Sequence, residues 1–347
     1  MSVLITADLH FSDNPRDQYR FDFMAEIERI LNEEKPDNFF ILGDLTEKKD
    51  FHSAVLVNMV STAINRLANF CPITILRGNH DGLDPQWPFY EFLDTLSDRI
   101  TFIKTPQAQV FDSLGSCLFL PHTSNYKKDW ARFIKEGFDD YDFIFAHNTF
   151  QGTASESGRK LDGIPTKIFP KGSTVITGDI HKPQTIKKKV TYVGSPYTVD
   201  FGDDYEPRLL LITLGDDASV IESAIESIPC TGAQKRLVEA RVTSKGKLVF
   251  DAEHVNPYDV LKVRVALSAK QYADWAAYRL LVLAWGEDNC YRVNLIQPKT
   301  EAANRKRALK TDTQSARSDE QIYTDYCSHL QIDRPTAKAG LKLLQKG

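Results

Sequence analysis

The stretch "ITILRGNHD", residues 73–81, joins an apolar run to a cluster of polar side chains. The run Ile-Thr-Ile-Leu is typical of a short buried strand, and Gly78 marks the turn that ends it. Asn79, His80 and Asp81 follow directly, a group that rarely gathers at a strand end for packing reasons alone. Because sites in open α/β sheets form at the carboxyl ends of strands, the stretch predicts an α/β fold with a polar site at one sheet edge.

The same arrangement recurs four more times along the first 200 residues. Apolar runs at 3–6, 39–42, 142–146 and 174–177 each look like a buried strand, and each is followed by a carboxylate or an imidazole. The residues that follow these runs are Asp8 and His10, Asp44, His147, and Asp179 with His181. Five strands that deliver such ligands to one edge predict a metal centre.

The residue types fit two adjacent divalent ions. Carboxylate, imidazole and amide ligands suit Mn²⁺, Fe²⁺, Mg²⁺ or Zn²⁺, and a carboxylate such as Asp44 can bridge two ions. Two ions about 3.5–4 Å apart clamp a phosphate and activate a water for attack on phosphorus. Each motif taken alone is also common in ordinary turns, so the prediction depends on all five in this order. His52, His122, His254 and His329 lack that context and are read as surface or core histidines.

These motifs resemble those of the calcineurin-like metallophosphoesterases, whose pattern is D-x-H, G-D, G-N-H-D/E, a lone H and G-H-x-H. The chain shows "DLH", "GD", "GNHD", "AHN" and "GDIH" in that order. The resemblance implies a four-layer α/β/β/α sandwich and a metal-dependent phosphoesterase. It also implies roles for the individual residues. Asp8, His10, Asp44 and His181 would hold one ion, and Asp44, Asn79, His147 and Asp179 the other; His80 would act beside the phosphate as an acid or transition-state stabiliser, oriented through its second nitrogen by Asp81.

The chain departs from the family pattern at Asp179, where the first histidine of G-H-x-H is expected. An aspartate still offers an oxygen ligand, and it makes the ligand set harder and more negative. Such a set favours Mn²⁺ or Mg²⁺, and we expect Mn²⁺. We interpret Asp179 as an altered ligand; the alternative is a weakened second site that holds its ion only together with substrate phosphate.

The patterning divides the chain into three predicted units. The first, residues 1–225, alternates strands with helical patterns, and residues 226–299 read as a small strand–helix–strand appendage. Residues 300–347 are polar and then helical, and we expect a helical C-terminal segment. Helices are predicted near 18–33, 53–69, 86–97 and 268–286, and further strands at 116–120, 208–214, 218–229, 260–267 and 290–296.

A second resemblance narrows the substrate. "VTYVGSPYTVDFGD", residues 190–203, resembles the Y-x-G-S-P…F-G-(D/E) stretch of SbcD-type nucleases, and the compact chain is shared by many viral versions, which fits a phage origin. The resemblance implies a Mn²⁺-dependent DNA exo/endonuclease in DNA repair, recombination or phage DNA processing. It makes 226–299 a capping, DNA-binding domain and 300–347 a docking segment for an SbcC-type ATPase, and it implies a homodimer.

Basic residues near the metal motifs are candidate DNA contacts. Arg16 and Arg20 follow the first motif, Lys48, Lys49 and His52 follow the second, and Lys182 follows the last. The aromatic run around Trp87, Phe89 and Tyr90 could stack on bases, but a helix start that faces the core is the favoured interpretation.

Composition limits the remaining classes. Net charge is −4, so DNA binding would need local basic patches. Five scattered cysteines without a C-x-x-C pair indicate no disulfide framework or zinc–cysteine site. The N-terminus does not resemble a signal peptide, and no apolar run reaches the ~20 residues of a membrane span. We therefore expect a cytoplasmic protein, in a bacterium or a phage-infected host, without membrane contact.

Two alternatives stay open at this point. A small-nucleotide phosphodiesterase or phosphatase of the same fold would hydrolyse nucleotides and leave DNA intact. A non-catalytic DNA-binding scaffold would need no acid at the phosphate, and the intact Asp44, Asn79 and His80 argue against it. Asp179 is the one residue that favours the scaffold.

Overall fold

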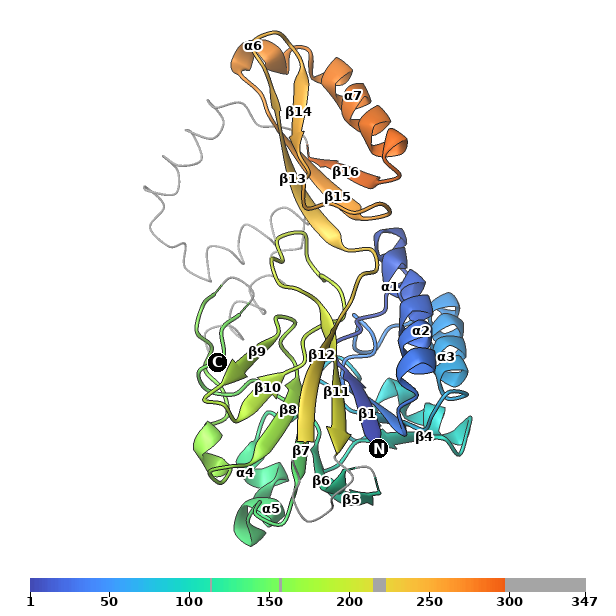
Figure 1. Ribbon diagram of the computed structural model, residues 1–347, viewed down its shortest axis with the longest axis vertical. Coiled ribbons are helices and arrows are strands. Elements are labelled where there is room, and N and C mark those ends of the chain that lie inside the picture. Colours follow the sequence, from blue (N-terminus) through green and yellow to red (C-terminus); the bar gives the residue numbers. More distant parts are fainter. Residues whose placement is uncertain (113, 156–157, 215–222, 297–347) are drawn as a thin grey trace, which may run out of the picture.

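The computed structural model describes residues 1–347 except 113, 156–157, 215–222 and 297–347. The described chain forms two six-stranded sheets and one four-stranded sheet. Figure 1 shows the two larger sheets in the lower body, with the four-stranded sheet above them. The predicted helical segment 300–347 lies outside the described residues.

The first sheet has the strand order β12-β11-β1-β2-β3-β4. Strands β1 to β4 run parallel to one another, whereas β11 and β12 are antiparallel additions at one side. The carboxyl ends of β1, β2 and β3 therefore lie at one edge. The strands are β1 (Ser2–Thr6), β2 (Asn38–Leu42), β3 (Ile73–Leu76), β4 (Ile100–Ile103), β11 (Arg208–Leu214) and β12 (Ser223–Pro229).

The second sheet has the order β5-β6-β7-β8-β10-β9. Its four central strands are parallel, and β5 and β9 pair antiparallel at the two edges. The ends of β7 and β8 therefore also share an edge. The strands are β5 (Gln107–Phe111), β6 (Gly115–Leu120), β7 (Phe143–His147), β8 (Thr174–Gly178), β9 (Gln184–Ile186) and β10 (Val190–Tyr192).

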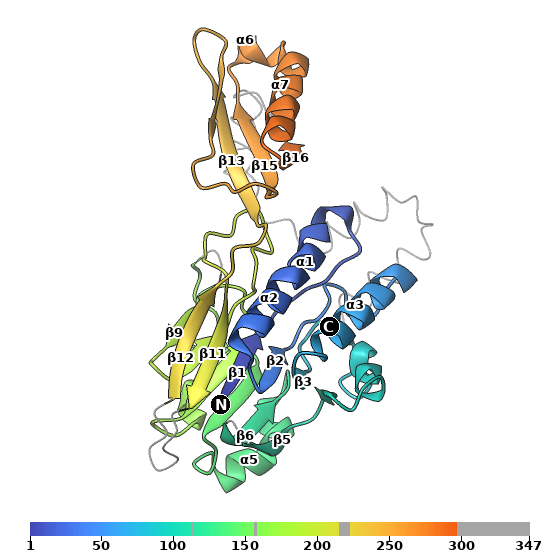
Figure 2. The same ribbon diagram turned by 45° about the vertical axis from the view of Figure 1, so that its right-hand side comes forward.

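Helices cover the outer face of each sheet, and α1, α2 and α3 lie along the first one (Figure 2). Helix α3 begins after Ser53, whose hydroxyl accepts a hydrogen bond from the Leu56 amide. Helix α2 ends where Lys35 takes a left-handed conformation. The helices of these two layers are α1 (Gln18–Asp22), α2 (Met24–Glu34), α3 (Ala54–Leu67), α4 (Tyr126–Asp129) and α5 (Ala131–Glu136), with 3-10 turns η1 (Pro15–Asp17), η2 (Phe89–Thr95) and η3 (Thr166–Ile168).

Three apolar cores separate the four layers. One lies between α2, α3 and the first sheet, one between the two sheets, and one between the second sheet and α5. Phe40 of the first sheet shows the middle core, because its ring lies 5.5 Å from Phe119 and 5.0 Å from Phe145 of the second. The predicted α/β/β/α sandwich is confirmed.

The third sheet has the order β14-β13-β15-β16, with β13, β15 and β16 parallel. Helix α7 packs on it through Val282, which is fully buried, and Trp285 stacks on Phe250 with ring centroids 3.8 Å apart. We call residues 235–296 the third-sheet unit. Its elements are β13 (Lys235–Val242), β14 (Leu248–Asp251), β15 (Val260–Ala266), α6 (Ala269–Tyr272), α7 (Trp275–Asp288) and β16 (Arg292–Ile296).

Two ion pairs join the third-sheet unit to the segment that follows the first metal motif. Lys235 Nζ lies 2.7 Å from Asp17 Oδ1, and both side chains are buried. Arg292 Nη2 lies 2.8 Å from Asp22 Oδ2 at the surface. The buried pair in particular fixes the third-sheet unit beside η1.

Several sequence-based element predictions need correction. The predicted helix over 86–97 is only the 3-10 turn η2, because Pro85 and Pro88 cannot donate the amide hydrogen bonds of an α-helix. The helix over 268–286 is two helices, α6 and α7. The sequence patterns did not predict β4, β5, β9, β10 or β14, which are at most five residues long. Within the described ranges, the structure contains no helix with the length and apolar character of a membrane span.

Candidate metal centre

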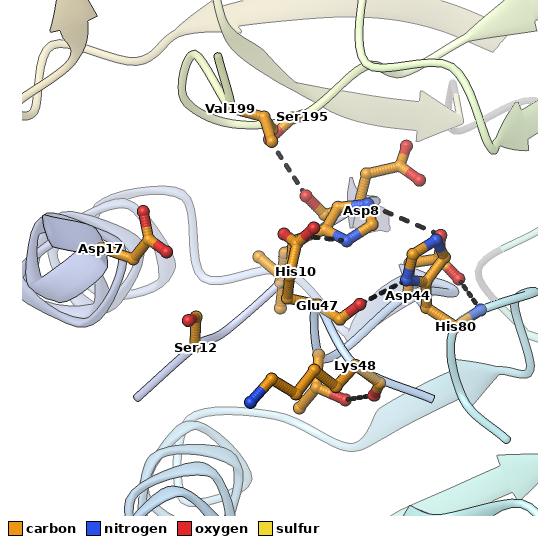
Figure 3. A network of polar contacts seen from close by, with 12 residues as sticks. Asp8, His10, Ser12, Asp17, Asp44, Glu47, Lys48, His80, Ser195 and Val199 are labelled. Atoms are coloured by element: carbon orange, nitrogen blue, oxygen red, sulfur yellow. Dashed lines mark hydrogen bonds and ion pairs between the residues drawn. The ribbon is translucent and has the colours of Figure 1, made fainter. Parts of the chain in front are cut away.

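The polar residues predicted from the five strand ends converge at one edge of the sandwich. Asp8 and His10 follow β1, Asp44 follows β2, and the 78–81 turn follows β3. From the facing sheet come His147 at the end of β7 and the 179–181 turn after β8. Figure 3 shows Asp8, His10, Asp44 and His80 gathered together. Ligand atoms lie within 4.8 Å of one another in three groups: Asp8, His10 and His181; His10, Asp44 and His80; Asp8, Asp44 and His147.

Two glycines allow the strand ends to come this close. A Cβ atom on Gly78 would lie 2.1 Å from Asp44 Oδ1, and one on Gly43 would lie 2.3 Å from Nδ1 of His147. Gly43 also has a φ of +88°, which side chains disfavour. Any larger residue at either position would push the ligands apart.

His10 and His181 lie beside Asp8 and Asp44, the residues predicted to hold the first ion. The Nε2 atoms of the two histidines lie 3.1 Å apart, and Asp44 Oδ2 lies 3.5 Å from Nε2 of His10. Among the described residues, Asp8 Oδ2 is buried without a hydrogen-bond partner. Two facing imidazole nitrogens beside an unpartnered carboxylate oxygen are the donor set that a shared cation satisfies.

His147 lies beside Asp44, Asn79 and Asp179, the residues predicted to hold the second ion with it. Its Nδ1 donates to the Leu42 carbonyl oxygen at 2.6 Å, which leaves Nε2 to face the site. That nitrogen lies 3.4 Å from Asp44 Oδ1, 3.9 Å from Asp179 Oδ1 and 2.9 Å from the Asn79 amide. The imidazole is thus oriented for a ligand by a main-chain carbonyl at the end of β2, in the facing sheet.

Asp179 occupies the place at which the sequence predicts a ligand. Its Oδ2 accepts a hydrogen bond from the Thr149 hydroxyl, and its backbone amide donates to Asp8 Oδ1 at 3.1 Å. Oδ1 faces His147. One carboxylate oxygen is therefore held by Thr149 and the other is directed into the second ion site. Metal binding by Asp179 stays a prediction that this geometry supports.

Burial sets the protonation of the cluster. It raises the pKa of Asp8 to about 7 and holds the pKa of His10 well below its ordinary value. Burial also acts to raise the pKa of Asp44, but the facing His147 and His10 outweigh it and the pKa is lowered. The same Asp44 carboxylate overcomes burial and raises the pKa of His147. In the metal-free protein, protons on Asp8 and His147 therefore balance the negative charge of the cluster. A bound cation would replace these protons.

Four of the predicted ligands lie in strained backbone. Asp8, His10, Asp44 and Asp179 have φ values of 55°, 43°, 57° and 85°. Non-glycine residues with positive φ cost free energy and persist where the surrounding structure enforces them, often at functional sites. The strain coincides with the converging turns.

The predicted role of Asp81 is wrong. Its buried carboxylate accepts hydrogen bonds from the backbone amides of Gly78, Asp44 and Leu45, at 2.6, 3.0 and 2.9 Å. Nδ1 of His80 instead lies 2.6 Å from the Glu47 carbonyl oxygen. Asp81 therefore ties two turns together, and the Glu47 main chain orients His80.

Glu47 is the residue that the sequence analysis missed. Its Oε2 lies 3.7 Å from Nδ1 of His10 and 2.9 Å from Nη1 of Arg20 (Figure 3 shows Glu47 beside His10). The available signal was its position in the turn "GDLTE", three residues after Asp44. A carboxylate behind the non-ligating nitrogen of a histidine is a common support for a metal ligand.

Arg20 is not a DNA contact. Its side chain is 2% exposed, and the guanidinium donates to the His10 carbonyl oxygen and to Glu47. Its position after the first metal motif predicted a DNA contact, but α1 turns the side chain inward beside Tyr19. Arg20 is thus a buried support for the first ion site.

The other predicted DNA contacts differ in their surroundings. Arg16 and Lys48 are exposed and Lys49 is half-buried. Lys182 pairs with Asp204 at 2.9 Å. His52 is committed to packing, because its Nε2 hydrogen-bonds Thr46 Oγ1 at 2.8 Å and its ring lies 4.1 Å from that of Phe89. Of the nearby aromatic run, Tyr90 is buried as expected, whereas Trp87 is 74% exposed.

The chain resembles several known proteins. It is 25% identical over 228 residues to a viral protein named "Putative phosphoesterase 244L", of Invertebrate iridescent virus 6, an alignment that covers 60% of this chain and 75% of that one. A structure of an archaeal phosphodiesterase matches with 14% identity and a TM-score of 0.36, over 66% of this chain and 100% of that one. A dimetal phosphatase from Danio rerio matches with 8% identity and a TM-score of 0.41, over 67% and 99%.

The family model for calcineurin-like phosphoesterases matches residues 1–183, more than half of the chain. That range contains the five motifs that converge in the structure. Members of this family use divalent metals, and the buried carboxylate, imidazole and amide groups described above fit such ions. The chain belongs to the calcineurin-like phosphoesterases, a family of metal-dependent enzymes that hydrolyse phosphoesters.

Proposed function

We propose that the chain is a DNA nuclease of the SbcD type, which hydrolyses phosphodiester bonds with two divalent ions, Mn²⁺ foremost. The observation that carries this proposal is a basic cleft between the sandwich and the third-sheet unit. The cleft has a volume of about 490 Å³, and among the described residues that line it there is no carboxylate. It is lined by Arg16, Phe201, Lys262, Trp275, Arg279, Leu283, Val293, Asn294 and Leu295.

The charge of the cleft suits a nucleic-acid backbone. Arg16, Lys262 and Arg279 supply three cations, and Lys262 Nζ lies 5.4 Å from the Phe201 ring. Cations of this kind attract phosphates regardless of base sequence. The whole chain carries a net charge of −4, so the three cations of the cleft do not simply reflect a basic composition.

The cleft is tied to the metal centre through a short segment. Arg16 lies in η1 between His10 and Arg20, and Asp17 next to it pairs with Lys235 of the third sheet. Arg20 donates to the His10 carbonyl oxygen. A backbone held at Arg16 would thus lie on the side of the first ion site, and the third-sheet unit would serve as the capping domain.

The residues fit defined roles in hydrolysis. Asp8, His10, Asp44 and His181 would hold one ion, and Asp44, Asn79, His147 and Asp179 the other. When bound, the ions supply Lewis-acid charge that polarises a phosphoester and acidifies water. Because Nδ1 of His80 donates to the Glu47 carbonyl, Nε2 is the nitrogen free to face a phosphoryl or leaving oxygen. There it stabilises charge or donates a proton.

The proposal includes a protein partner, a homodimer and a cellular location. Residues 300–347 would dock an SbcC-type ATPase, the nuclease would form a homodimer, and it would work in the cytoplasm of a bacterium or a phage-infected host. The support is the resemblance of residues 190–203 to SbcD-type nucleases. The action would be DNA repair, recombination or phage DNA processing.

The test uses the full-length protein, stripped of metal and then given Mn²⁺. End-labelled duplex DNA and single-stranded circles are the substrates, a cyclic dinucleotide and an aryl phosphodiester run alongside, and His80→Ala is the matched variant. We expect DNA cleavage by the wild type and a loss of about 10²–10⁴-fold in His80→Ala, with metal content unchanged. Turnover of the small diesters with DNA intact, also in the presence of an SbcC-type ATPase, would assign the chain to the small-nucleotide phosphodiesterases.

A non-catalytic scaffold is tested at Asp179. We expect Asp179→His to lower Mn²⁺-dependent hydrolysis, because Thr149 and the backbone around residue 179 hold a carboxylate. A gain of activity from a wild type that hydrolyses almost nothing would instead identify a site that has drifted away from catalysis.

A further inference from the structure

A groove of about 730 Å³ opens beside the second ion site. Three segments form it: the turn after Asp81, the loop after β4 and the loop after β6. Its basic and aromatic lining residues are Arg77, Trp87, Lys104, His122, Lys128 and Trp130. Two carboxylates also line it, and both accept hydrogen bonds: Asp84 from the Gln86 amide and Asp129 from the Thr123 hydroxyl. The mechanism proposed above uses none of them.

The inner end of the groove adjoins the metal ligands. The ring of His122 lies 6.2 Å from that of His147. Arg77 is buried and its guanidinium contacts the carbonyl oxygens of Gly78, Lys104 and His122. Arg77 therefore ties the loops after β4 and β6 to Gly78, next to Asn79, and Lys104 Nζ donates to the Gln86 carbonyl oxygen in the turn after Asp81 at 3.1 Å. The groove is thus fixed relative to the second ion site.

Two polar atoms along the groove have no hydrogen-bond partner among the described residues. One is Nε1 of Trp130, a side chain that is fully buried, and the other is Nδ1 of His122. Buried donors and acceptors are nearly always paired in folded proteins. Both atoms lie behind the surface of the lining, so a polar group that penetrates the wall of the groove, from water or from a ligand, would satisfy them.

The outer end presents an aromatic ring beside positive charge. Trp87 is 74% exposed, and Lys104 Nζ lies 5.6 Å from its ring centre while it also pairs with Glu91 at 2.5 Å. The exposed Lys128 lies across the groove. An exposed indole offers a face on which a base can stack, and the amines can contact a phosphate.

We infer that this groove is a nucleoside subsite, which binds the nucleotide next to the phosphate held at the metal centre. The inference rests on the proposed function, because it assumes that the substrate is a nucleic acid or nucleotide diester. The volume lies within the ~300–1,000 Å³ of ligand sites. The base stacks on Trp87, and the sugar-phosphate leads inward past His122.

The test compares inhibition by thymidine monophosphate with inhibition by inorganic phosphate, using hydrolysis of an aryl phosphodiester as the reporter. The ratio of the two inhibition constants measures how much the nucleoside adds to binding. Because both constants are taken within one variant, a change in overall activity cancels. The variants are Trp87→Ala and, as a conservative replacement, Trp87→Phe. The matched control is Leu83→Ala, an exposed apolar residue on the same turn that does not line the groove.

We expect the wild type to bind the nucleotide more tightly than phosphate and Trp87→Ala to lose at least about fivefold of that preference, the lower end of base–aromatic stacking. Trp87→Phe should keep most of the preference, and Leu83→Ala all of it. An unchanged ratio in Trp87→Ala would overturn the subsite. This outcome is independent of DNA cleavage: a wild type that leaves DNA intact would remove the nuclease proposal, while the inhibition ratio would still decide the groove.

Discussion

The third sheet and one edge of the sandwich are both built from parallel strands, yet only the edge of the sandwich brings carboxylates and imidazoles together. We call this edge, at which the predicted metal ligands converge, the metal edge. Strands β1, β2, β7 and β8 run into carboxylates and imidazoles that lie buried and close together. Strands β13 and β15 run into Thr243, Ser244 and Ser268, and their charged neighbours pair at the surface, as Arg264 does with Glu239 at 2.7 Å. Parallel strands alone therefore do not make a site. Two facing sheets, whose strand ends point at one space, do.

The largest expected effect comes from Asp44, which faces both ion sites. Asp44→Ala should lower Mn²⁺-dependent hydrolysis by more than about 100-fold, because it removes a ligand and not only a supporting contact. Activity and bound metal are measured on the same preparation. Glu239→Ala in the third sheet is the matched control and should leave both unchanged. Full metal content in Asp44→Ala would contradict the assigned ligand.

The corrected role of Asp81 predicts a loss of stability. Asp81→Ala leaves three backbone amides without their acceptor, and each unpaired buried group costs about 1–3 kcal/mol. We expect the free energy of unfolding of the metal-free protein to fall by roughly 3 kcal/mol or more, measured by urea denaturation. If instead stability holds and only the pH profile of hydrolysis moves, Asp81 acts on His80 after all.

Glu47 should contribute to metal binding without being a ligand. We expect Glu47→Ala to weaken binding of the first ion by about 10–100-fold, the usual effect of a residue that orients a metal-binding histidine. Glu47→Gln keeps an oxygen toward His10 and Arg20 and should recover most of the affinity. Calorimetric titration with Mn²⁺ measures both. Equal affinities in Glu47→Ala and wild type would leave Glu47 with only its main-chain contact to His80.

The pH dependence of metal binding follows from Asp8. Burial raises its pKa to about 7 in the metal-free protein, so below that pH a proton must leave before the carboxylate can bind a cation. Affinity should therefore fall by up to about tenfold for each unit of pH below about 7, and it should keep rising above 7 because the raised pKa of His147 means that this predicted ligand must also lose a proton. Calorimetry in buffers of different ionisation enthalpy counts the released protons. A pH-independent affinity with no proton release would exclude Asp8 as a ligand.

The smallest effect belongs to the third sheet. Arg264 and Glu239 are about half exposed, so their ion pair is screened by water. Arg264→Ala should change the free energy of unfolding by less than about 1 kcal/mol. A fall in the free energy of unfolding as large as that of Asp81→Ala would mean that the charged residues of the third sheet stabilise the fold as strongly as those of the metal edge.

The sequence predicted the fold and the positions of the converging residues because each depends on a local pattern. An apolar run followed by a polar turn places Asp8, Asp44 and His147 at strand ends without any knowledge of long-range contacts. The support behind them could not be predicted in this way. Asp81 bonds a turn 37 residues earlier, and Arg20 reaches Glu47 from another element. Such contacts depend on the path that loops take through the folded protein, and a local sequence pattern does not predict that path. Trp87 lies between Pro85 and Pro88, before η2 begins, and its exposure likewise depends on the path of a loop.

The left-handed backbone at Asp8, His10, Asp44 and Asp179 has an evolutionary consequence. Each such residue lowers the free energy of unfolding by about 1–3 kcal/mol. The four together therefore cost an amount comparable to the roughly 5–15 kcal/mol that stabilises a typical domain. Glycine would relieve this strain at every one of the four positions. A lineage that had abandoned catalysis and kept the fold for binding would drift toward glycine there, since nothing would oppose the gain in stability. Carboxylate and imidazole side chains therefore occupy positions where the backbone favours glycine, so stability is lost at the same residues that supply the predicted metal ligands.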